Sequence, residues 1–286
     1  MIMSKKTTLA VAVASTLLAG NALAAGKGEV LVLLSSETQL ALKDGKQYTT
    51  GFYLNEFGVP ADRLLKAGYE LVLVTPKGNA PRVDESSVTA QYFGGDEQEM
   101  QRIRTLVENL PGIDDTLSLE EVLESDLNRY AGLLIPGGHA PLIDLANNPE
   151  VGALLRHFHQ SGKPTAAICH GPIALLSAQR DPAAYQAALA NGEKPVADDW
   201  IYRGYRMTIF STPEEQVFEQ SLQGERILFY PASAMESAGG KLNYAEAWAP
   251  HVVVDRELIT GQNPFSDHAL GEKLVQMLNA NHHQAQ

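Results

Sequence analysis

Short apolar runs alternate along this chain with segments whose apolar positions recur at helical spacing. Strands covered on both faces show no polar side, so continuous apolar runs are typical of a parallel sheet. Such runs predict buried strands at residues 28–36, 69–76, 130–140 and 164–168, the third ending in a glycine pair. Two later runs predict further strands at 205–210 and 251–255.

Helical spacing between these runs predicts the connecting helices. Residues 77–115 are polar with little strand pattern, and we expect loop and helix there. Helices are expected from about Pro60 to Ala67, over Asn148 to Ser161, over 171–178 and over 269–278. An irregular or helical turn is expected just before Pro60. Regular alternation of strand and helix predicts one α/β domain with a flavodoxin-like, open, mostly parallel sheet sandwiched by helices.

The N-terminus has the order of a secretory signal peptide. Two lysines precede an apolar run at residues 8–20, and small residues follow at Ala22 and Ala24. The run is short for a membrane span and no stop-transfer pattern follows, which argues against an uncleaved anchor. We expect an exported, periplasmic protein with no membrane association after cleavage. Its domain would cover residues 25–280, with a frayed tail over 281–286.

Composition narrows the class of partner. The chain has 286 residues, of which 44% are hydrophobic and 20% charged, as in an ordinary globular domain. A net charge of -12 argues against nucleic acid or an anionic membrane as a partner, because both repel an acidic protein.

The chain has a single cysteine, Cys169, directly after the run at 164–168. Exported proteins usually pair their cysteines, and a lone one is a packing residue, an intermolecular link or a working thiol. Ligand sites of doubly wound sheets lie at the carboxyl ends of strands, where this residue falls. Ala167 and Gly171, two positions away on either side, are small enough for a tight strand-to-helix turn. The pattern therefore favours a nucleophile elbow at Cys169.

A buried packing cysteine is the alternative interpretation. The amides at the start of the following helix are expected to favour thiolate over thiol, which would hold the pKa of Cys169 below the roughly 8.5 of a free cysteine. His170 is adjacent, but neighbouring side chains do not automatically meet, so its role as a base is less strongly indicated.

The segment A-I-C-H-G-P at 167–172 resembles the signature of the DJ-1/PfpI superfamily, relatives of class I glutamine amidotransferases. Further segments resemble the branch that contains glyoxalase III and the heat-inducible chaperone-deglycases. They lie in order along nearly the whole mature chain, at 50–60, 67–78, 83–87, 133–140, 207–215 and 258–266. Several ordered matches are more specific than C-H-G alone.

The resemblance implies a set of site residues. Cys169 matches the reactive nucleophile of the family, Glu56 the carboxylic acid beside it, and His170 the histidine of the catalytic triad. Gly138 matches the glycine whose amide helps to bind an oxyanion, with the His170 amide as its partner. A carboxyl that touches a thiolate should hold a proton, because like charges repel.

The third triad member is implied to be Glu215, with Glu214 as its rival. By pattern alone both would be interpreted as a solvated helix start. Neighbouring helix positions point about a hundred degrees apart, so only one of the two faces the cleft. His139 is expected to line the cleft entrance, and Trp248 to serve as packing or rim. Some relatives hold a metal with histidines and a glutamate; this chain has no histidine between residues 36 and 133, so we expect no metal.

The resemblance implies a glyoxalase III-like enzyme. Its thiolate would attack the aldehyde of a small 2-oxoaldehyde such as methylglyoxal, Glu56 and His170 would move protons, and water would release a hydroxy acid. No glutathione or organic cofactor is implied. The deglycase version of this chemistry acts on early glycation adducts of proteins. The family often forms homodimers, and the oligomeric state stays open.

Two other classes of function compete with this one. An amidase or peptidase could use the same cysteine and histidine through an acyl-thioester. A holding chaperone or redox-stress protein would instead expose an apolar patch or have its thiol oxidised without turnover.

Removal of the signal peptide is directly testable. We expect protein recovered from the periplasm to begin near Ala25, because the small residues before it form the cleavage site. Intact-mass measurement reads the first residue. A mass that retains Met1 to Ala24 would overturn the export prediction.

Overall fold

The computed structural model describes residues 26–284, so the predicted signal peptide and its cleavage position lie outside the described residues. A seven-stranded sheet runs through the centre in the order β10-β11-β7-β6-β1-β4-β5. Every neighbouring pair is parallel except β10 with β11. The predicted open, mostly parallel sheet is therefore confirmed. Its strands are β1 (Glu29–Leu33), β4 (Glu70–Thr75), β5 (Leu117–Ser118), β6 (Tyr130–Ile135), β7 (Thr165–Ile168), β10 (Val252–Asp255) and β11 (Leu258–Gly261).

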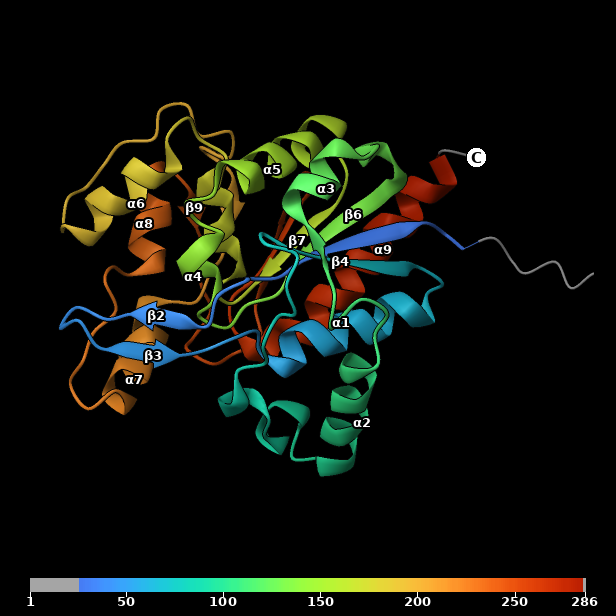
Figure 1. Ribbon diagram of the computed structural model, residues 1–286, viewed down its shortest axis with the longest axis horizontal. Coiled ribbons are helices and arrows are strands. Elements are labelled where there is room, and N and C mark those ends of the chain that lie inside the picture. The colour runs from blue at the N-terminus through green and yellow to red at the C-terminus, as the bar shows by residue number, and fades with distance from the viewer. Residues whose placement is uncertain (1–25, 285–286) are drawn as a thin grey trace, which may run out of the picture.

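Helices cover both faces of this sheet (Figure 1). The α-helices are α1 (Leu54–Lys66), α2 (Glu97–Glu108), α3 (Leu119–Glu124), α4 (Pro141–Asp144), α5 (Pro149–Ser161), α6 (Pro182–Ala190), α7 (Thr212–Ser221), α8 (Pro231–Ala238) and α9 (Asp267–Gln284). Short 3₁₀ helices are η1 (Glu85–Ser87), η2 (Ala90–Phe93), η3 (Leu127–Arg129), η4 (Gly171–Ser177) and η5 (Pro264–Ser266). No described helix is long and apolar enough to cross a membrane.

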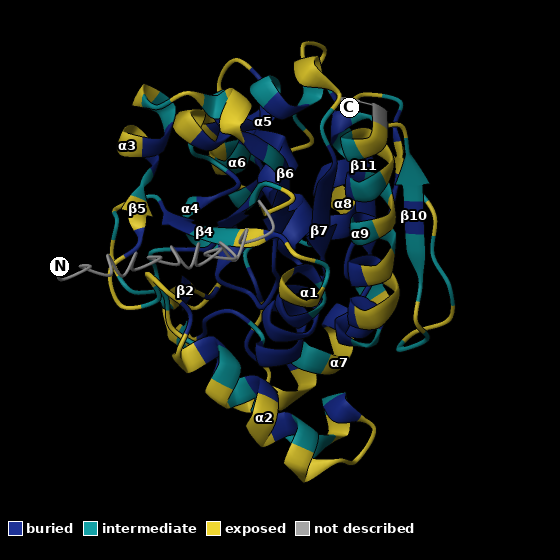
Figure 2. Cartoon of the chain, turned by 90° about the vertical axis from the view of Figure 1, so that its right-hand side faces the viewer, coloured by how far each residue is buried: buried dark blue, intermediate teal, exposed yellow. Residues whose placement is uncertain are grey.

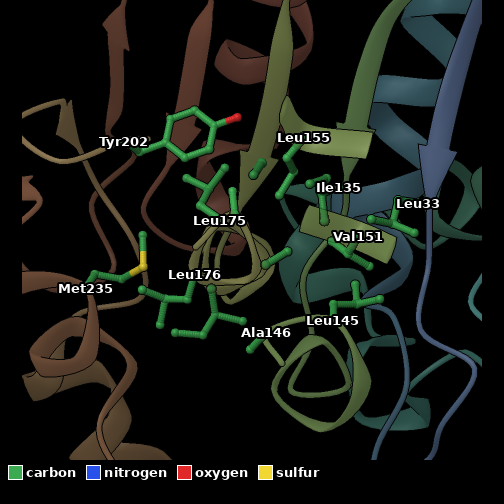
Figure 3. Packing of buried hydrophobic residues seen from close by; sticks show 14 of the residues in the cluster. Leu33, Ile135, Leu145, Ala146, Val151, Leu155, Leu175, Leu176, Tyr202 and Met235 are labelled. Carbon is green, nitrogen blue, oxygen red and sulfur yellow. The ribbon is translucent and has the colours of Figure 1, made fainter. Parts of the chain in front are cut away.

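Strand β1 shows how the sheet builds two cores. Val30 and Val32 belong to the cluster that packs under α1 and α9, whereas Leu31 and Leu33 belong to the cluster under α5. Successive side chains of a strand point to opposite faces, so an unbroken apolar run is needed to fill both. The buried centre and exposed outer helix faces are visible in Figure 2, and the α5 side of the core in Figure 3.

Two small strand pairs lie outside the main sheet. β2 (Gln39–Ala41) and β3 (Gln47–Thr49) form an antiparallel hairpin that extends beside α7 (Figure 1). β8 (Arg206–Met207) pairs with β9 (Lys241–Leu242). Of the strand expected over 205–210, only Arg206–Met207 is a strand. The residues that follow make other hydrogen bonds: the Thr208 amide donates to the Thr260 hydroxyl and the Phe210 amide to the Cys169 carbonyl, both at 2.9 Å.

Some helix boundaries differ from the expected ones. α1 begins at Leu54, so the turn before Pro60 is helical and continuous with the helix, because burial of its side chains, Leu54 and Phe57 among them, stabilises it. The segment after Cys169 is a 3₁₀ helix, η4, rather than an α-helix. α9 continues to Gln284, within the predicted tail of 281–286, whose last two residues lie outside the described residues.

Helix α1 carries Glu56 and is pressed against α2 at Gly58. A Cβ on Gly58 would collide with the Ile103 side chain and lie 3.1 Å from Val107. We expect Gly58→Ala to lower the free energy of unfolding by about 1 kcal/mol, because overpacking of about 1–3 kcal/mol exceeds the gain in helix propensity. Leu65→Ala, on a partly exposed face of the same helix, is the control. Denaturant unfolding measures the free energy of unfolding of both variants. A Gly58→Ala chain as stable as the parent would show that α1 and α2 can move apart without a loss of stability.

Candidate active site

Cys169 occupies a strained turn at the carboxyl end of β7. Its φ is +58°, a left-handed conformation that costs a non-glycine residue on the order of 1–3 kcal/mol. Backbone hydrogen bonds hold both sides of the turn: the Cys169 amide donates to the Gly261 carbonyl at 2.9 Å, and the Phe210 amide donates to the Cys169 carbonyl at 2.9 Å. This is the strand–turn–helix geometry of a nucleophile elbow.

The turn at Cys169 packs closely against two glycines that have no space for a side chain. A Cβ on Gly171 would collide with the Ile135 carbonyl and lie 3.1 Å from that of Pro136, both at the end of the neighbouring strand β6. A Cβ on Gly137 would lie 2.7 Å from the Cys169 Cβ and run into the Glu56 carboxyl. The end of β6 therefore fits against the elbow only without side chains at these positions.

The structure brings Cys169, His170 and Glu215 into one chain of contacts. The Cys169 Sγ lies 3.4 Å from the Nδ1 of His170, and the His170 Nε2 lies 2.7 Å from a Glu215 oxygen. All three side chains are buried. Burial by itself would raise the pKa of Glu215, but His170 and His139 hold it well below its usual range. Glu215 is therefore a carboxylate that accepts a hydrogen bond from His170.

His139 shares the same carboxylate. Its Nε2 lies 2.8 Å from the second Glu215 oxygen, and its ring lies 4.0 Å from that of His170. Since Glu215 only accepts, both rings carry their proton on Nε2. Burial, and then the neighbouring His139, lower the pKa of His170, so its ring is neutral and its Nδ1 lone pair faces the thiol. His139 lies at the centre of the site rather than at the expected entrance.

Glu56 reaches the thiol from α1 and is fully buried. Burial raises its pKa well above the usual range, and the charge of Asp267 adds to this effect. The Cys169 thiol and the amides of Gly137 and Gly138 lower the pKa of Glu56, but by less than burial raises it. Neither carboxyl oxygen has a well-aligned hydrogen-bond partner among the described residues. At neutral pH we therefore expect Glu56 to be a carboxylic acid.

Gly138 adopts a left-handed conformation, with φ of +82°. A Cβ there would collide with the Gly51 carbonyl and lie 3.1 Å from the Tyr53 amide nitrogen. The close approach explains why the position needs glycine. In this structure the Gly138 amide opposes the rise in the pKa of Glu56. Its implied role in binding an oxyanion stays a prediction.

The expectation that Cys169 has a lowered pKa is wrong in sign. Burial raises the pKa of the thiol. The structure also replaces the expected α-helix after the cysteine by the 3₁₀ helix η4, seven residues long. Desolvation outweighs the helix amides here, so the resting nucleophile is a thiol that needs a base.

Glu214 is not the solvated helix start that the sequence suggested. It is fully buried, and one of its oxygens accepts hydrogen bonds from the amide and hydroxyl of Ser211 at 2.9 and 2.6 Å. The other accepts from the Trp248 amide at 2.7 Å and the Asn263 side chain at 2.8 Å. The two neighbouring carboxylates of α7 thus hold different parts of the site.

A cavity of about 260 Å³ opens onto the thiol. Cys169, His139 and His170 are among the residues that line it. Its other walls are mostly aromatic, and are formed by Tyr48, Tyr53, Tyr92, Phe210, Phe218 and Trp248, with Ser86, Val217, Ser221 and Pro264. Sequence reasoning placed Trp248 as packing or rim and missed the other five aromatic residues, because they come from segments far apart in the chain.

His139, His170 and Glu215 are also close enough to hold a metal ion, since one ligand atom of each lies within 4.8 Å of the others. A metal at this position would take the Nε2 atoms that now carry protons toward Glu215. The expected absence of a metal stays a prediction.

Comparison with known proteins settles the family. The chain matches the DJ-1/PfpI family over residues 48–277, most of its length. The chain belongs to the DJ-1/PfpI family. The protein/nucleic acid deglycase HchA of Staphylococcus aureus strain bovine RF122 / ET3-1 is 26% identical over 261 residues, which cover 89% of this chain and 82% of the relative.

Solved structures agree on the DJ-1/PfpI fold. Glyoxalase III from Candida albicans superposes with a TM-score of 0.67 at 22% identity, covering 88% of this chain and 98% of its own. The 24 kDa Rapid Encystment Protein of Francisella tularensis gives a TM-score of 0.65 at 21% identity, covering 88% and 99%. The resemblance to DJ-1/PfpI proteins inferred from the motifs is thereby confirmed.

The raised pKa of Cys169 predicts slow alkylation at neutral pH. We expect the labelling rate with iodoacetamide to rise through a midpoint above the roughly 8.5 of a free thiol, because only the thiolate reacts. The same protein in denaturant is the control and should titrate near the free value. A native midpoint below that of the denatured chain would show that the pKa of Cys169 is lowered, as expected from the helix amides, and would contradict this prediction.

Proposed function

We propose that this protein is a cysteine enzyme that converts small 2-oxoaldehydes into 2-hydroxy acids without glutathione or an organic cofactor. The contact between the Cys169 Sγ and the neutral His170 Nδ1, at 3.4 Å, carries the proposal. A buried thiol with a raised pKa becomes a nucleophile only when a base takes its proton during attack. His170, oriented by Glu215, is placed to do this.

The first step adds the thiol to the aldehyde. His170 takes the thiol proton, the sulfur–carbon bond forms, and the aldehyde oxygen takes a proton from the Glu56 carboxylic acid. The product is a hemithioacetal on Cys169. Because Glu56 is buried and holds its proton, it can supply this proton where an ionised carboxylate could not.

The next steps move hydrogen between the two carbons of the substrate. Glu56, now ionised, removes the proton on the former aldehyde carbon while protonated His170 gives its proton to the ketone oxygen, which forms an enediol and returns His170 to its neutral form. Glu56 then gives its proton to the neighbouring carbon and takes the proton of the hydroxyl on the former aldehyde carbon. This leaves a thioester of the 2-hydroxy acid. A water molecule, activated by His170, cleaves the thioester, releases the acid and restores the thiol. The sum is addition of one water with no external oxidant or reductant.

The deglycase reaction is a second candidate, and the similarity to HchA favours it. Its substrates would be early adducts of 2-oxoaldehydes with amines or thiols, which present the same carbon to Cys169. A cavity of about 260 Å³ admits the end of such an adduct. The same small cavity argues against a peptidase, which must bind an extended chain.

Turnover of methylglyoxal to lactate by the purified protein tests the proposal. Cys169→Ala should abolish activity, because no other described side chain in the cavity is a thiol. Chiral analysis of the lactate and loss of the aldehyde are measured together. Lactate production by Cys169→Ala equal to that of the parent would overturn the proposal.

Glu215 and Glu56 should each matter for rate and little for folding. We expect Glu215→Gln and Glu56→Gln to lower kcat about a hundredfold or more, since an amide neither orients His170 as a carboxylate does nor delivers a proton. Glu150→Gln, in the exposed first turn of α5, is the matched control and should leave kcat unchanged. Near-normal rates for Glu56→Gln would remove Glu56 from the mechanism while leaving Cys169 in place.

A further inference from the structure

The cavity over Cys169 is walled by aromatic rings and carries no fixed charge. None of the described residues that line it is Asp, Glu, Lys or Arg. Edge-to-face contacts order part of the wall, with Tyr48 5.0 Å from Phe218 and Trp248 5.6 Å from Phe210 between ring centroids. A substrate anion would lose water here and gain no cation in return, which is costly.

Trp248 is held in place by its backbone rather than by its ring alone. Its φ is +66°, a left-handed conformation that needs support from its surroundings. The support is Glu214, whose carboxylate accepts the Trp248 amide proton at 2.7 Å. The Trp248 ring then packs on Phe210, and the Phe210 ring lies 4.7 Å from the catalytic histidine, His170.

Glu214 ties this wall to the rest of the site. Besides Trp248 it binds Ser211 at the start of α7 and the Asn263 side chain, and Gln262 approaches both of its oxygens at 3.2 Å. Asn263 also donates to the Ala249 carbonyl at 2.8 Å, one residue after Trp248. A carboxylate with this many donors is fully satisfied although buried, and the donors fix the loop that presents the indole.

The free space exceeds what a three-carbon aldehyde needs. A dry apolar cavity of about 150 Å³ accommodates benzene in other proteins, and this one measures about 260 Å³. Aromatic walls favour a flat apolar group through offset or edge-to-face packing. The polar atoms needed for chemistry lie close together: the Cys169 Sγ is 3.4 Å from the His170 Nδ1, and the His139 and His170 rings are 4.0 Å apart.

We propose that the site prefers 2-oxoaldehydes whose ketone carries a flat apolar substituent, the arylglyoxals, and that Trp248, anchored by Glu214, is the residue that determines this preference. The proposal deepens the proposed function and rests on it. Glu214 is a positioning residue in this scheme, since it acts through Trp248 and touches no reacting atom.

Kinetics with three aldehydes test the preference. The parent protein should show a higher kcat/KM for phenylglyoxal than for methylglyoxal, and a lower one for 4-carboxyphenylglyoxal, whose carboxylate has no partner in the cavity. Trp248→Ala should lower kcat/KM for phenylglyoxal about tenfold, chiefly through KM, and change methylglyoxal by less than about threefold. Trp248→Phe should restore most of the loss. Glu214→Gln should shift the ratio in the same direction.

Trp200→Phe is the control, because Trp200 is the other tryptophan of the chain, is buried and does not line the cavity. Its aldehyde ratio should equal that of the parent. Equal losses for phenylglyoxal and methylglyoxal in Trp248→Ala would overturn the specificity role. Failure of the parent to turn over any aldehyde would instead contradict the proposed function.

A binding measurement tests the aromatic preference separately from turnover. In a Cys169→Ala, Trp200→Phe chain, Trp248 is the only tryptophan and no covalent adduct can form. Acetophenone should quench its fluorescence saturably, acetone should not, and adding Glu214→Gln should weaken acetophenone binding and shift the emission. No saturable quenching by acetophenone would overturn the aromatic preference whatever the turnover shows.

Discussion

The site depends on a single backbone constraint, the left-handed turn at Cys169. The turn lifts the sulfur away from the sheet and toward His170, and it persists because the neighbouring strands hold its amide and its carbonyl. The turn also requires glycine at two positions that have no room for a side chain. One is Gly137, just after β6, and the other is Gly171, two residues after Cys169. The two cores of the sheet thus stabilise a conformation that an isolated peptide would avoid.

Buried charge is the second organising feature. Glu56 is kept as an acid by burial, whereas Glu215 stays ionised in an equally buried place because two imidazoles donate to it. Two carboxyl groups that surround the same thiol therefore have opposite protonation states, which suits one as a proton donor and the other as an orienting acceptor. Glu214 shows a third use of the same group, as an anchor for backbone and amide donors.

Much of this was predictable from the sequence, and the remainder was not for physical reasons. Apolar runs and small residues beside Cys169 predicted the sheet and the elbow, since both are local consequences of burial and backbone geometry. The position of His139 and the aromatic wall depend on segments brought together only by the fold. The thiol pKa was predicted with the wrong sign because a sequence shows the helix that follows a cysteine but not how completely water is excluded from it.

The first turn of α7 sets a limit on how this protein can diverge. Glu214 and Glu215 leave the helix in different directions, one toward the Trp248 loop and the other toward the histidine pair. Adding or deleting one residue between Phe210 and Glu214 would rotate both carboxylates together, by roughly the hundred degrees that separates helical neighbours. The number of residues is therefore constrained at this junction. The β2–β3 hairpin lies outside the main sheet, but Tyr48 on β3 lines the cavity, so the hairpin can vary only where this side chain keeps its place.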